Sequence, residues 1–332
     1  MKVLLACMLH PYGDSRRGYS YEYYNFYLSL KQMGHEVELF DYMSEVRSLG
    51  KESMNQKLLA RVREWRPALV LFSLYTDQFL PSVVEQLRAH TTTFCFFHDD
   101  TWRVEYSRSW ARHFDFFSTT DPNNELKYRE MGLANAIYFP FGCNEQLYRK
   151  LDEPKKHDVS FVGEWHPHRE WLLKRLRSAG VMVIAAGRRW PRGVIGQEEM
   201  VRIFNESRVN LNLSNSASWD ARYLLSSARA LVDRVRSHKT VEQLKARHFE
   251  INGCGSFQLS YYVDGLEKCY RAGEEIAIYA DPDDLVDKVR FYLAHESIRE
   301  SIAEAGYRRT LADHTYAARF QGVFRRMGLP DG

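Results

Sequence analysis

The chain has little cysteine, and none of it is arranged in closely spaced pairs. Five cysteines occur among 332 residues, with no C-x-x-C motif: Cys7, Cys95, Cys143, Cys254 and Cys269. This pattern indicates neither a disulfide framework nor a zinc knuckle. We therefore expect reduced thiols in a cytoplasmic protein.

Long apolar runs and an excess of one charge are also lacking. No run approaches the ~18 apolar residues that a membrane-spanning helix needs. The opening stretch Met1–Leu9 lacks a small-residue cleavage site, so we interpret it as a buried strand rather than a signal peptide. The 46 basic and 43 acidic residues give a net charge of +3, which gives no reason to expect nucleic-acid binding.

The sequence does contain a regular alternation of apolar runs with amphipathic stretches. In the first half, strand-like runs occur at residues 3–9, 37–40, 68–74, 93–97, 114–118 and 136–139. Helical patterns separate them, near residues 19–30, 54–65, 81–89, 104–113 and 123–131. Apolar runs spaced by helices are typical of a parallel sheet that is covered on both faces. The first half therefore predicts a doubly wound α/β domain.

A second series of strands and helices follows a break in this pattern. The periodicity stops and the charge rises near residues 140–156, which predicts a linker. Strands are then predicted at 158–162, 181–186 and 209–213, with helices near 168–178 and 197–207. We expect domains over residues 1–150 and 151–312 that face each other across a cleft. Ligands bind at the carboxyl ends of the strands in such sheets.

Three segments of the second half have competing interpretations. Trp219–Leu244 has helical spacing and predicts one helix roughly 39 Å long, used for packing or for forming a homo-oligomer. The basic turn Arg188–Arg192 either contacts an anionic ligand or a membrane surface, or is a solvated loop. The acidic segment Asp281–Asp284 invites a metal interpretation, but an aspartate followed by proline predicts a capped helix N-terminus.

One stretch near the end of the second half, residues 241–260, combines charge with glycine. Cations and bare backbone amides suit phosphate groups, and a carboxylate can accept two hydrogen bonds from the hydroxyls of a sugar. Glycine lets a backbone N–H group approach a ligand closely. The candidate ligand groups are two cations, two carboxylates and the glycine turn: Lys245, Arg247, Glu242, Glu250, Gly253, Gly255 and Ser256.

The segment Arg247-His-Phe-Glu-Ile-Asn-Gly-Cys-Gly-Ser-Phe-Gln-Leu259 resembles the signature of the spore-maturation CgeB-like glycosyltransferases, which are two-domain GT-B enzymes. The match continues through residues 262–267, 273–285, 305–306 and 314–316, and appears upstream at 158–163. It covers the C-terminal half almost throughout and the N-terminal half more loosely. The resemblance implies a GT-B fold of two Rossmann-like domains, with residues 313–332 crossing back to the first domain.

The resemblance also implies roles for residues of this stretch. Glu242 and Glu250 are spaced like the E-x7-E motif of many retaining GT-B enzymes, in which the first carboxylate meets the transferred sugar and the second meets the ribose. Arg247 resembles the arginine that binds the donor diphosphate, where it would neutralise charge on the leaving group.

The strand-to-helix turns of the second domain add candidates on the donor side. Gly163 begins the first turn, where backbone amides and a helix N-terminus predict an anion site. Arg169 adds positive charge there, and Gly187 ends the next strand. His166 and His168 lack further ligands at the spacing that zinc sites use, so we do not interpret them as a metal site.

In the first domain, three polar residues follow an apolar strand: His98, Asp99 and Asp100. His98 resembles the histidine that lies near the donor sugar in retaining GT-B enzymes. Asp99 or Asp100 is a candidate general base, or orients the acceptor; the alternative is that one of them caps the following helix. The loop after the first strand supplies acceptor-side candidates: His10, Gly13, Asp14 and Arg17.

These residues and the resemblance together predict a glycosyltransferase that moves a sugar from a UDP-, GDP- or dTDP-sugar to a hydroxyl-bearing glycan, lipid, protein or small molecule. The resemblance to GT-B enzymes also implies no cofactor and no metal, because basic residues replace the metal at the diphosphate. The inverting or retaining outcome stays open. The alternatives are a nucleotide-sugar epimerase or hydrolase on the same fold, and a non-catalytic sugar-nucleotide-binding or scaffold protein.

Overall fold

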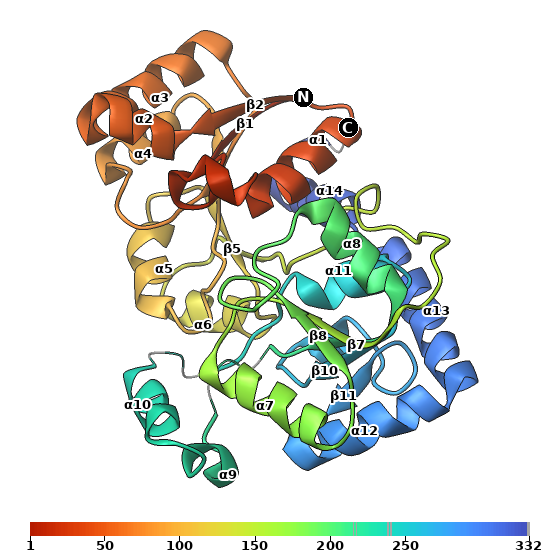
Figure 1. Cartoon of the computed structure of the whole chain (residues 1–332). Helices are drawn as coiled ribbons and strands as arrows, with labels where there is room; N and C mark the ends of the chain where they lie inside the picture. The colour runs from red at the N-terminus through yellow and green to blue at the C-terminus, as the bar shows by residue number, and fades with distance from the viewer. Residues whose placement is uncertain (215, 217, 238, 240, 331–332) are drawn as a thin grey trace. The chain divides into compact units, whose positions relative to one another are not determined.

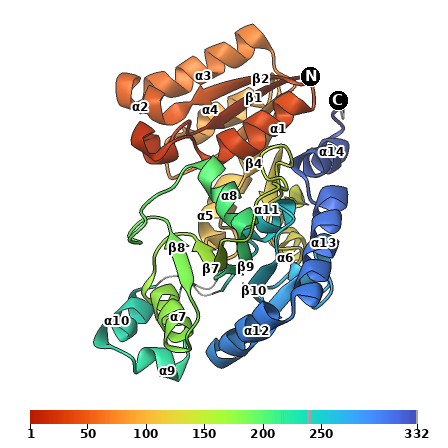
Figure 2. The same cartoon turned by 45° about the vertical axis from the view of Figure 1, so that its right-hand side comes forward.

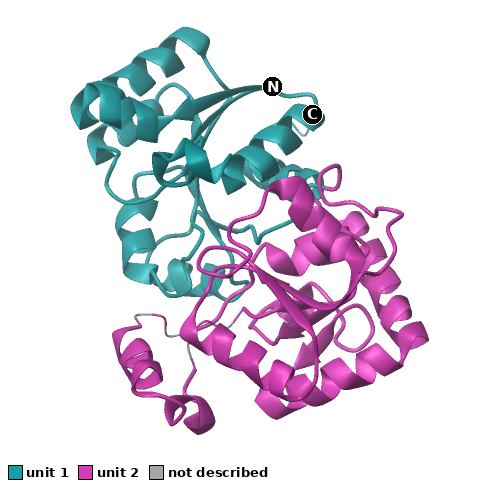
Figure 3. Cartoon of the chain, viewed as in Figure 1, with its two compact units in different colours: residues 1–144, 316–332 teal, residues 145–315 magenta. Residues whose placement is uncertain are grey.

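The computed structural model describes residues 1–330 apart from 215, 217, 238 and 240. The chain forms two compact units (Figure 3), with Met1–Asn144 and Tyr316–Gly332 in unit 1 and Glu145–Thr315 in unit 2. Each unit is built on a parallel sheet with helices, so the prediction of two Rossmann-like α/β domains is confirmed.

Unit 1 contains a six-stranded sheet in the order β2-β1-β3-β4-β5-β6 (Figure 1). Its strands are β1 (Lys2–Cys7), β2 (Glu36–Asp41), β3 (Leu69–Ser73), β4 (Thr92–Phe96), β5 (Phe116–Thr119) and β6 (Ala136–Tyr138). Its α-helices are α1 (Leu28–Gln32), α2 (Tyr42–Leu49), α3 (Lys51–Trp65), α4 (Pro81–Leu87), α5 (Val104–Ala111), α6 (Asn124–Glu130) and α14 (Tyr316–Met327). The short helices are η1 (Pro11–Gly13), η2 (Ser15–Arg17) and the π-helical turn η3 (Tyr23–Tyr27).

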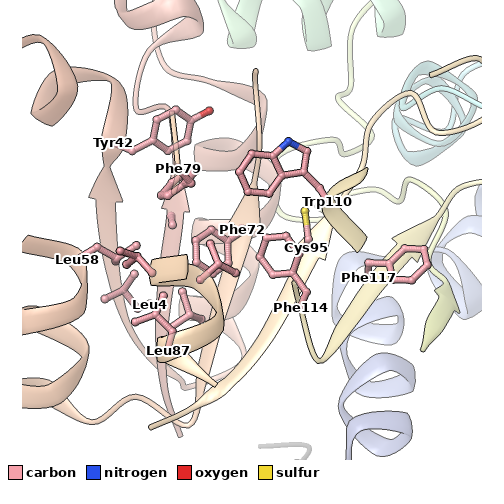
Figure 4. Close-up of a cluster of buried hydrophobic side chains, with 14 of the residues drawn as sticks. Leu4, Tyr42, Leu58, Phe72, Phe79, Leu87, Cys95, Trp110, Phe114 and Phe117 are labelled. Carbon is pink, nitrogen blue, oxygen red and sulfur yellow. The ribbon is translucent and has the colours of Figure 1, made fainter. Parts of the chain in front are cut away.

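The strands of unit 1 are apolar because both faces of the sheet are covered. Leu4 and Ala6 of β1 belong to a core that also contains side chains of α2, α3 and α4 (Figure 4). Since successive side chains of a strand point to opposite faces, the intervening Val3 and Leu5 face the other layer, and they are equally buried. Full burial of consecutive strand residues explains the continuous apolar runs in the sequence.

The second layer of unit 1 joins the two ends of the chain. Phe26 of η3 packs edge-to-face against Tyr316 of α14, with ring centroids 5.2 Å apart. Phe320 of α14 lies 5.3 Å from Phe139, which directly follows β6. The last helix is therefore part of the core of unit 1, although it follows the whole of unit 2 in the sequence.

Unit 2 contains a five-stranded parallel sheet in the order β11-β10-β9-β7-β8 (Figures 1 and 2). Its strands are β7 (His157–Val162), β8 (Val183–Ala186), β9 (Ser207–Asn212), β10 (Gln258–Tyr261) and β11 (Ala277–Tyr279). Its helices are α7 (Pro167–Ser178), α8 (Gln197–Glu206), α9 (Ala221–Leu224), α10 (Ala228–Arg236), α11 (Arg247–Gly253), η4 (Leu266–Lys268), α12 (Pro282–Ala294) and α13 (Glu296–Asp313). Across the described residues of both units, no helix is long and apolar enough to cross a membrane.

The predicted helix cap at Asp281 is confirmed. The Asp281 carboxylate accepts hydrogen bonds from the N–H groups of Asp283 at 2.7 Å and Asp284 at 3.2 Å, and Pro282 occupies the first turn of α12. These bonds satisfy donors that the helix itself leaves unpaired. The acidic segment is therefore a helix start.

The predicted long helix over 219–244 is wrong. The chain forms the short helices α9 and α10, and residues 238 and 240 of the predicted helix lie outside the described part. Ser227 interrupts the helical path because it adopts an extended conformation, φ −170° and ψ 153°, and its side chain accepts from the Ala230 N–H group. A serine cap competes with helix continuation, and the periodic spacing on either side of it concealed the break.

Candidate functional site in unit 2 and polar edge of unit 1

The carboxyl ends of all five strands of unit 2 lie at one edge of its sheet, because the strands are parallel. A cavity of about 390 Å³ opens at this edge beside the ends of β10 and β11. Of the predicted site residues, Glu242 lines it. The other polar and aromatic side chains of its lining include His168, Trp219, Asp220, Arg234, Lys239, Tyr261, Tyr279 and Asp281.

Glu242 and Lys239 form an ion pair in the cavity wall. The Lys239 ammonium group bonds to the Glu242 carboxylate and lies 3.3 Å from the Ser216 hydroxyl. Glu242 also accepts from the Ser216 N–H group at 3.2 Å. Burial lowers the pKa of Lys239, and Glu242 opposes this shift. Burial therefore destabilises the protonated ammonium group of Lys239 in the cavity wall unless a negatively charged group lies beside it.

Arg169, in the first turn of α7, is held by backbone carbonyl groups. Its Nε donates to the Leu213 carbonyl at 2.8 Å and its Nη1 to the Glu164 carbonyl at 2.9 Å. Burial, against the opposing effect of Glu242 and with a smaller contribution from the charge of Arg247, lowers its pKa to about 10. Arg169 thus interacts electrostatically with both Glu242 and Arg247.

Arg247 and Glu250 lie one turn apart on α11 and form an ion pair. Glu250 is 3% exposed and also accepts from the Tyr148 hydroxyl at 2.7 Å. The Arg247 guanidinium lies over the Phe204 ring at 5.4 Å and keeps 24% of its side chain exposed. The structure therefore buries Glu250 beneath α11, whereas Glu242 reaches the cavity.

These groups form a cationic cluster, which we define as Arg169, Lys239, Lys245 and Arg247. Glu242 pairs with Lys239 and Glu250 pairs with Arg247, whereas Arg169 is bound by backbone carbonyl groups, so the positive charge of Arg169 is in excess. The half-buried His166 responds to this field: burial, together with the nearby Arg169 and Lys239, lowers its pKa to about 4. An anion bound here would relieve the repulsion among the cations.

The glycines of the strand-end turns serve close packing instead of presenting amides to a ligand. The Gly163 N–H group donates to Ala186 O at 2.9 Å, and the Gly187 N–H group donates to Gly193 O at 2.7 Å. Gly187 has φ 131°, and a Cβ atom there would lie 2.1 Å from Gly163 O. The Gly163 amide is therefore already bonded and is not free for an anion, whereas the N-terminus of α7 in the same turn stays a prediction.

The turn at Gly253, Gly255 and Ser256 closes the C-terminal end of α11. The Gly255 N–H group donates to Asn252 O at 2.9 Å, and the Ser256 N–H group donates to Ile251 O at 3.3 Å. Gly255 has φ +63°, and a Cβ atom there would collide with the Lys150 side chain. The prediction that this turn offers bare amides to phosphates is wrong, because those amides satisfy helix carbonyls.

Polar residues also gather at the carboxyl edge of the sheet in unit 1. His98 follows β4, Ser73 ends the neighbouring β3, and Glu22 precedes η3. His98 Nε2 lies 2.9 Å from Glu22 Oε1 and 3.0 Å from Ser73 Oγ, and Ser73 donates to Glu22 at 2.5 Å. Burial raises the pKa of Glu22, but the bonds from His98 and Ser73 outweigh it and the pKa is lowered. The imidazole is thus held against a buried carboxylate.

The structure separates Asp100 from His98. Asp100 is fully buried and accepts from the hydroxyl groups of Thr119 at 2.5 Å and Thr120 at 2.9 Å, and from the Asn124 amide at 3.2 Å. The predicted role of Asp100 as a general base or as a contact to the acceptor is therefore wrong. Its carboxylate instead links the end of β4 to β5 and α6. Asp99 is half-buried, and its carbonyl accepts from the Arg103 N–H group at 2.9 Å.

The loop after β1 reaches the same edge, since β1 is the parallel neighbour of β3. His10 Nδ1 lies 2.8 Å from Gly18 O. Asp14 caps η2 and pairs with Arg16 at 2.9 Å and with Arg17 at 3.7 Å. Gly13 has φ +67°, and its carbonyl accepts from Arg47. The loop is therefore organised by its own polar contacts.

Four features of these sites were not predicted from the sequence: Glu22, Ser73, Lys239 and the aromatic lining of the cavity. In the sequence, Glu22 and Ser73 are flanked by apolar and aromatic residues. Nothing in those flanking residues distinguishes the two from ordinary helix-capping residues. A signal for Lys239 did exist, since it precedes Glu242 by three residues. Within the described ranges, no group of three His, Cys, Asp or Glu side chains is placed to hold a metal ion.

Comparisons with known proteins agree with this geometry. Residues 168–325 match a protein-family model described as glycosyl transferase-like. The spore protein CgeB of Bacillus subtilis (strain 168) is 22% identical over 236 residues, which cover 66% of this chain and 69% of that protein.

Two solved structures show a similar fold over 99% of both chains. Sucrose-phosphate synthase from Thermosynechococcus elongatus aligns with a TM-score of 0.65 at 12% identity. HepE from Anabaena, solved in complex with UDP and glucose, aligns with a TM-score of 0.63 at 11% identity.

The two parallel sheets and the solved structures define the class of fold, which is GT-B. The glycosyl transferase-like match over residues 168–325 supports an enzyme that transfers a sugar from a nucleotide-sugar donor. The earlier resemblance is confirmed as well, since the chain is similar to the spore protein CgeB.

Proposed function

We propose that unit 2 binds a UDP-sugar and holds its diphosphate on the cationic cluster. The excess of positive charge beside the cavity is the observation that carries this proposal. Arg169, Lys239 and Arg247 would neutralise the charge that develops on the leaving nucleoside diphosphate as the C–O bond to the sugar breaks, a task that needs no metal ion. HepE, a neighbour in fold, was solved with UDP, which favours UDP over GDP and dTDP.

The aromatic and acidic lining of the cavity suits the remaining parts of such a donor. Tyr261 and Tyr279 lie with ring centroids 5.6 Å apart in the wall. Aromatic faces pack against sugars and bases. Glu242, which pairs with Lys239, can accept hydrogen bonds from sugar hydroxyl groups.

Unit 1 would supply the acceptor side, with His98 as the base and Glu22 as its positioning residue. Nε2 lies 2.9 Å from Glu22 Oε1, so a proton on this nitrogen would bind the carboxylate. The acceptor hydroxyl would give its proton to the imidazole while its oxygen forms the new bond to the sugar. The electron pair of the broken C–O bond would leave with the diphosphate.

The state of the cysteines supports a cytoplasmic location for this reaction. All five are free thiols buried in the structure, and burial raises the pKa of the thiols of Cys7, Cys95 and Cys254. Thiols that are buried and unpaired are typical of proteins in a reducing compartment.

A thermal-shift screen tests the donor. UDP, GDP, dTDP and uridine are added separately at equal concentration. UDP should raise the melting temperature most, since a ligand at about 100 times its Kd stabilises by about 2.7 kcal/mol. Uridine, which lacks phosphates, should have little effect. Equal shifts with UDP and uridine would contradict the role of the cationic cluster, and a larger shift with GDP would exclude UDP as the donor nucleotide.

A further inference from the structure

The helix α10 presents an apolar face to solvent. Its apolar residues recur at positions i, i+3, i+4 and i+7, the spacing that places side chains on one face of a helix: Ala228, Leu231, Val232 and Val235. Leu231 and Val232 are each 48% exposed, and Val235 is 77% exposed. Ala230, on the opposite side, is the buried residue of this helix. An ordinary surface helix buries its apolar face, whereas α10 exposes its apolar face to solvent.

The neighbouring connection adds a further exposed apolar residue. Leu225, between α9 and α10, is 84% exposed. We call Leu225, Leu231, Val232 and Val235 the α10 face. Exposed apolar groups that gather in this way mark an interaction site more often than chance exposure does.

Arginines flank the α10 face. Arg229 and Arg236 are exposed on α10. Arg229 lies 4.8 Å and Arg189 lies 5.9 Å from the Trp165 ring, so the basic turn after β8 joins the same surface. Among the described residues, these three arginines form no ion pair with a carboxylate, in contrast to Arg222, which pairs with Asp220 and Asp283.

We propose that the α10 face docks on an anionic lipid surface. A partner must be apolar where it meets Leu231 and Val235 and anionic where it meets Arg189, Arg229 and Arg236. A bilayer with acidic headgroups offers both, with phosphates for the guanidinium groups and acyl chains for the apolar residues. A second copy of this chain would bring like charges together, which favours lipid over self-association.

The helix α10 also borders the cavity of unit 2. Arg234 of the same helix lines the donor cavity, with its guanidinium 4.0 Å from the Trp219 ring. Docking through the α10 face places the cavity beside the lipid headgroups. The inference concerns lipid binding, so it stands or falls independently of the nucleotide bound in the cavity.

Vesicle co-sedimentation tests the proposal without donor or acceptor. Wild type is mixed with vesicles of phosphatidylcholine alone or with equal parts of phosphatidylglycerol. The double variant Leu231→Gln/Val235→Gln keeps helix propensity and removes the apolar contact. Arg229→Gln/Arg236→Gln removes charge alone, and Ile298→Gln on α13, 41% exposed, is the matched control.

We expect wild type and Ile298→Gln to sediment with the phosphatidylglycerol vesicles and to be released by salt. Each double variant should bind roughly tenfold more weakly or worse. Failure of wild type to bind, or unchanged binding of Leu231→Gln/Val235→Gln, would overturn the proposal. A dimer that this variant dissociates would assign the face to a second copy. A lowered melting temperature of the variant without vesicle binding would assign it to contacts within the chain.

Discussion

At the scale of single residues, His98 shows what sequence pattern can and cannot find. The position of His98 after an apolar strand indicated a polar edge, and the structure places it there. Its partner Glu22 lies 76 residues earlier and could not be found, because only the fold brings the two together. Asp100 follows the same apolar strand as His98, yet its carboxylate is buried and hydrogen-bonded to Thr119, Thr120 and Asn124. These partners are 19 to 24 residues away along the chain, so the sequence around Asp100 does not indicate them.

We predict that Glu22→Gln lowers kcat about a hundredfold while KM for the donor changes little, since a positioned general base contributes about that much. Steady-state kinetics with the donor concentration varied measure both kcat and KM.

Glu85→Gln is the matched control for this variant. Glu85 pairs with His113 at 2.7 Å on the surface of the same unit, so its loss should leave kcat unchanged. An unaltered kcat in Glu22→Gln would contradict the role assigned to the pair.

At the scale of elements, most strands were predictable and the connections were not. Full burial in parallel sheets produces the apolar runs that identified β1, β3, β4 and β9. Strand β11 has only three residues, Ala277–Tyr279, too short for a periodic signal. The segment that became α9 and α10 was predicted as one helix because apolar spacing does not reveal whether a face is covered.

The contact between the turns after β7 and β8 gives a prediction about Gly187. A Cβ atom at Gly187 would lie 2.1 Å from Gly163 O, and φ there is 131°. We expect Gly187→Ala to cost about 3 kcal/mol of the free energy of unfolding. Chemical denaturation measures this loss.

Gly196→Ala is the control for this change, because nothing lies within 4 Å of a Cβ atom there and its φ is −72°. Gly196 is the N-cap of α8, where alanine is less favourable than glycine, so the change should cost at most about 1 kcal/mol. Equal effects of the two variants would show that the close approach of the turns is not what requires glycine.

At the scale of the whole molecule, the chain leaves unit 1 at Asn144 and returns to it at Tyr316. The return was expected only from the family resemblance, since nothing in the sequence of the last helix indicates which unit it joins. Its aromatic residues decide this, because they complete the layer formed by Phe26 and Phe139.

We therefore predict that Phe320→Ala destabilises unit 1 by about 4 kcal/mol, as expected for a fully buried phenylalanine. Hydrogen exchange should become faster in β4 and β6 and stay unchanged in β9 and β10. Phe291→Ala on α12, where the ring is 44% exposed, is the control and should cost far less. Faster exchange in β9 instead of β6 would show that α14 supports unit 2.

The central claim is that the cationic cluster binds the diphosphate of the donor. Isothermal titration of UDP and of uridine into wild type, Lys239→Gln, Arg247→Gln and the exposed control Arg308→Gln tests it most directly. We predict that each cluster variant weakens UDP roughly ten- to a hundredfold and leaves uridine unchanged, while Arg308→Gln matches wild type. UDP affinity that survives both cluster substitutions would contradict the account.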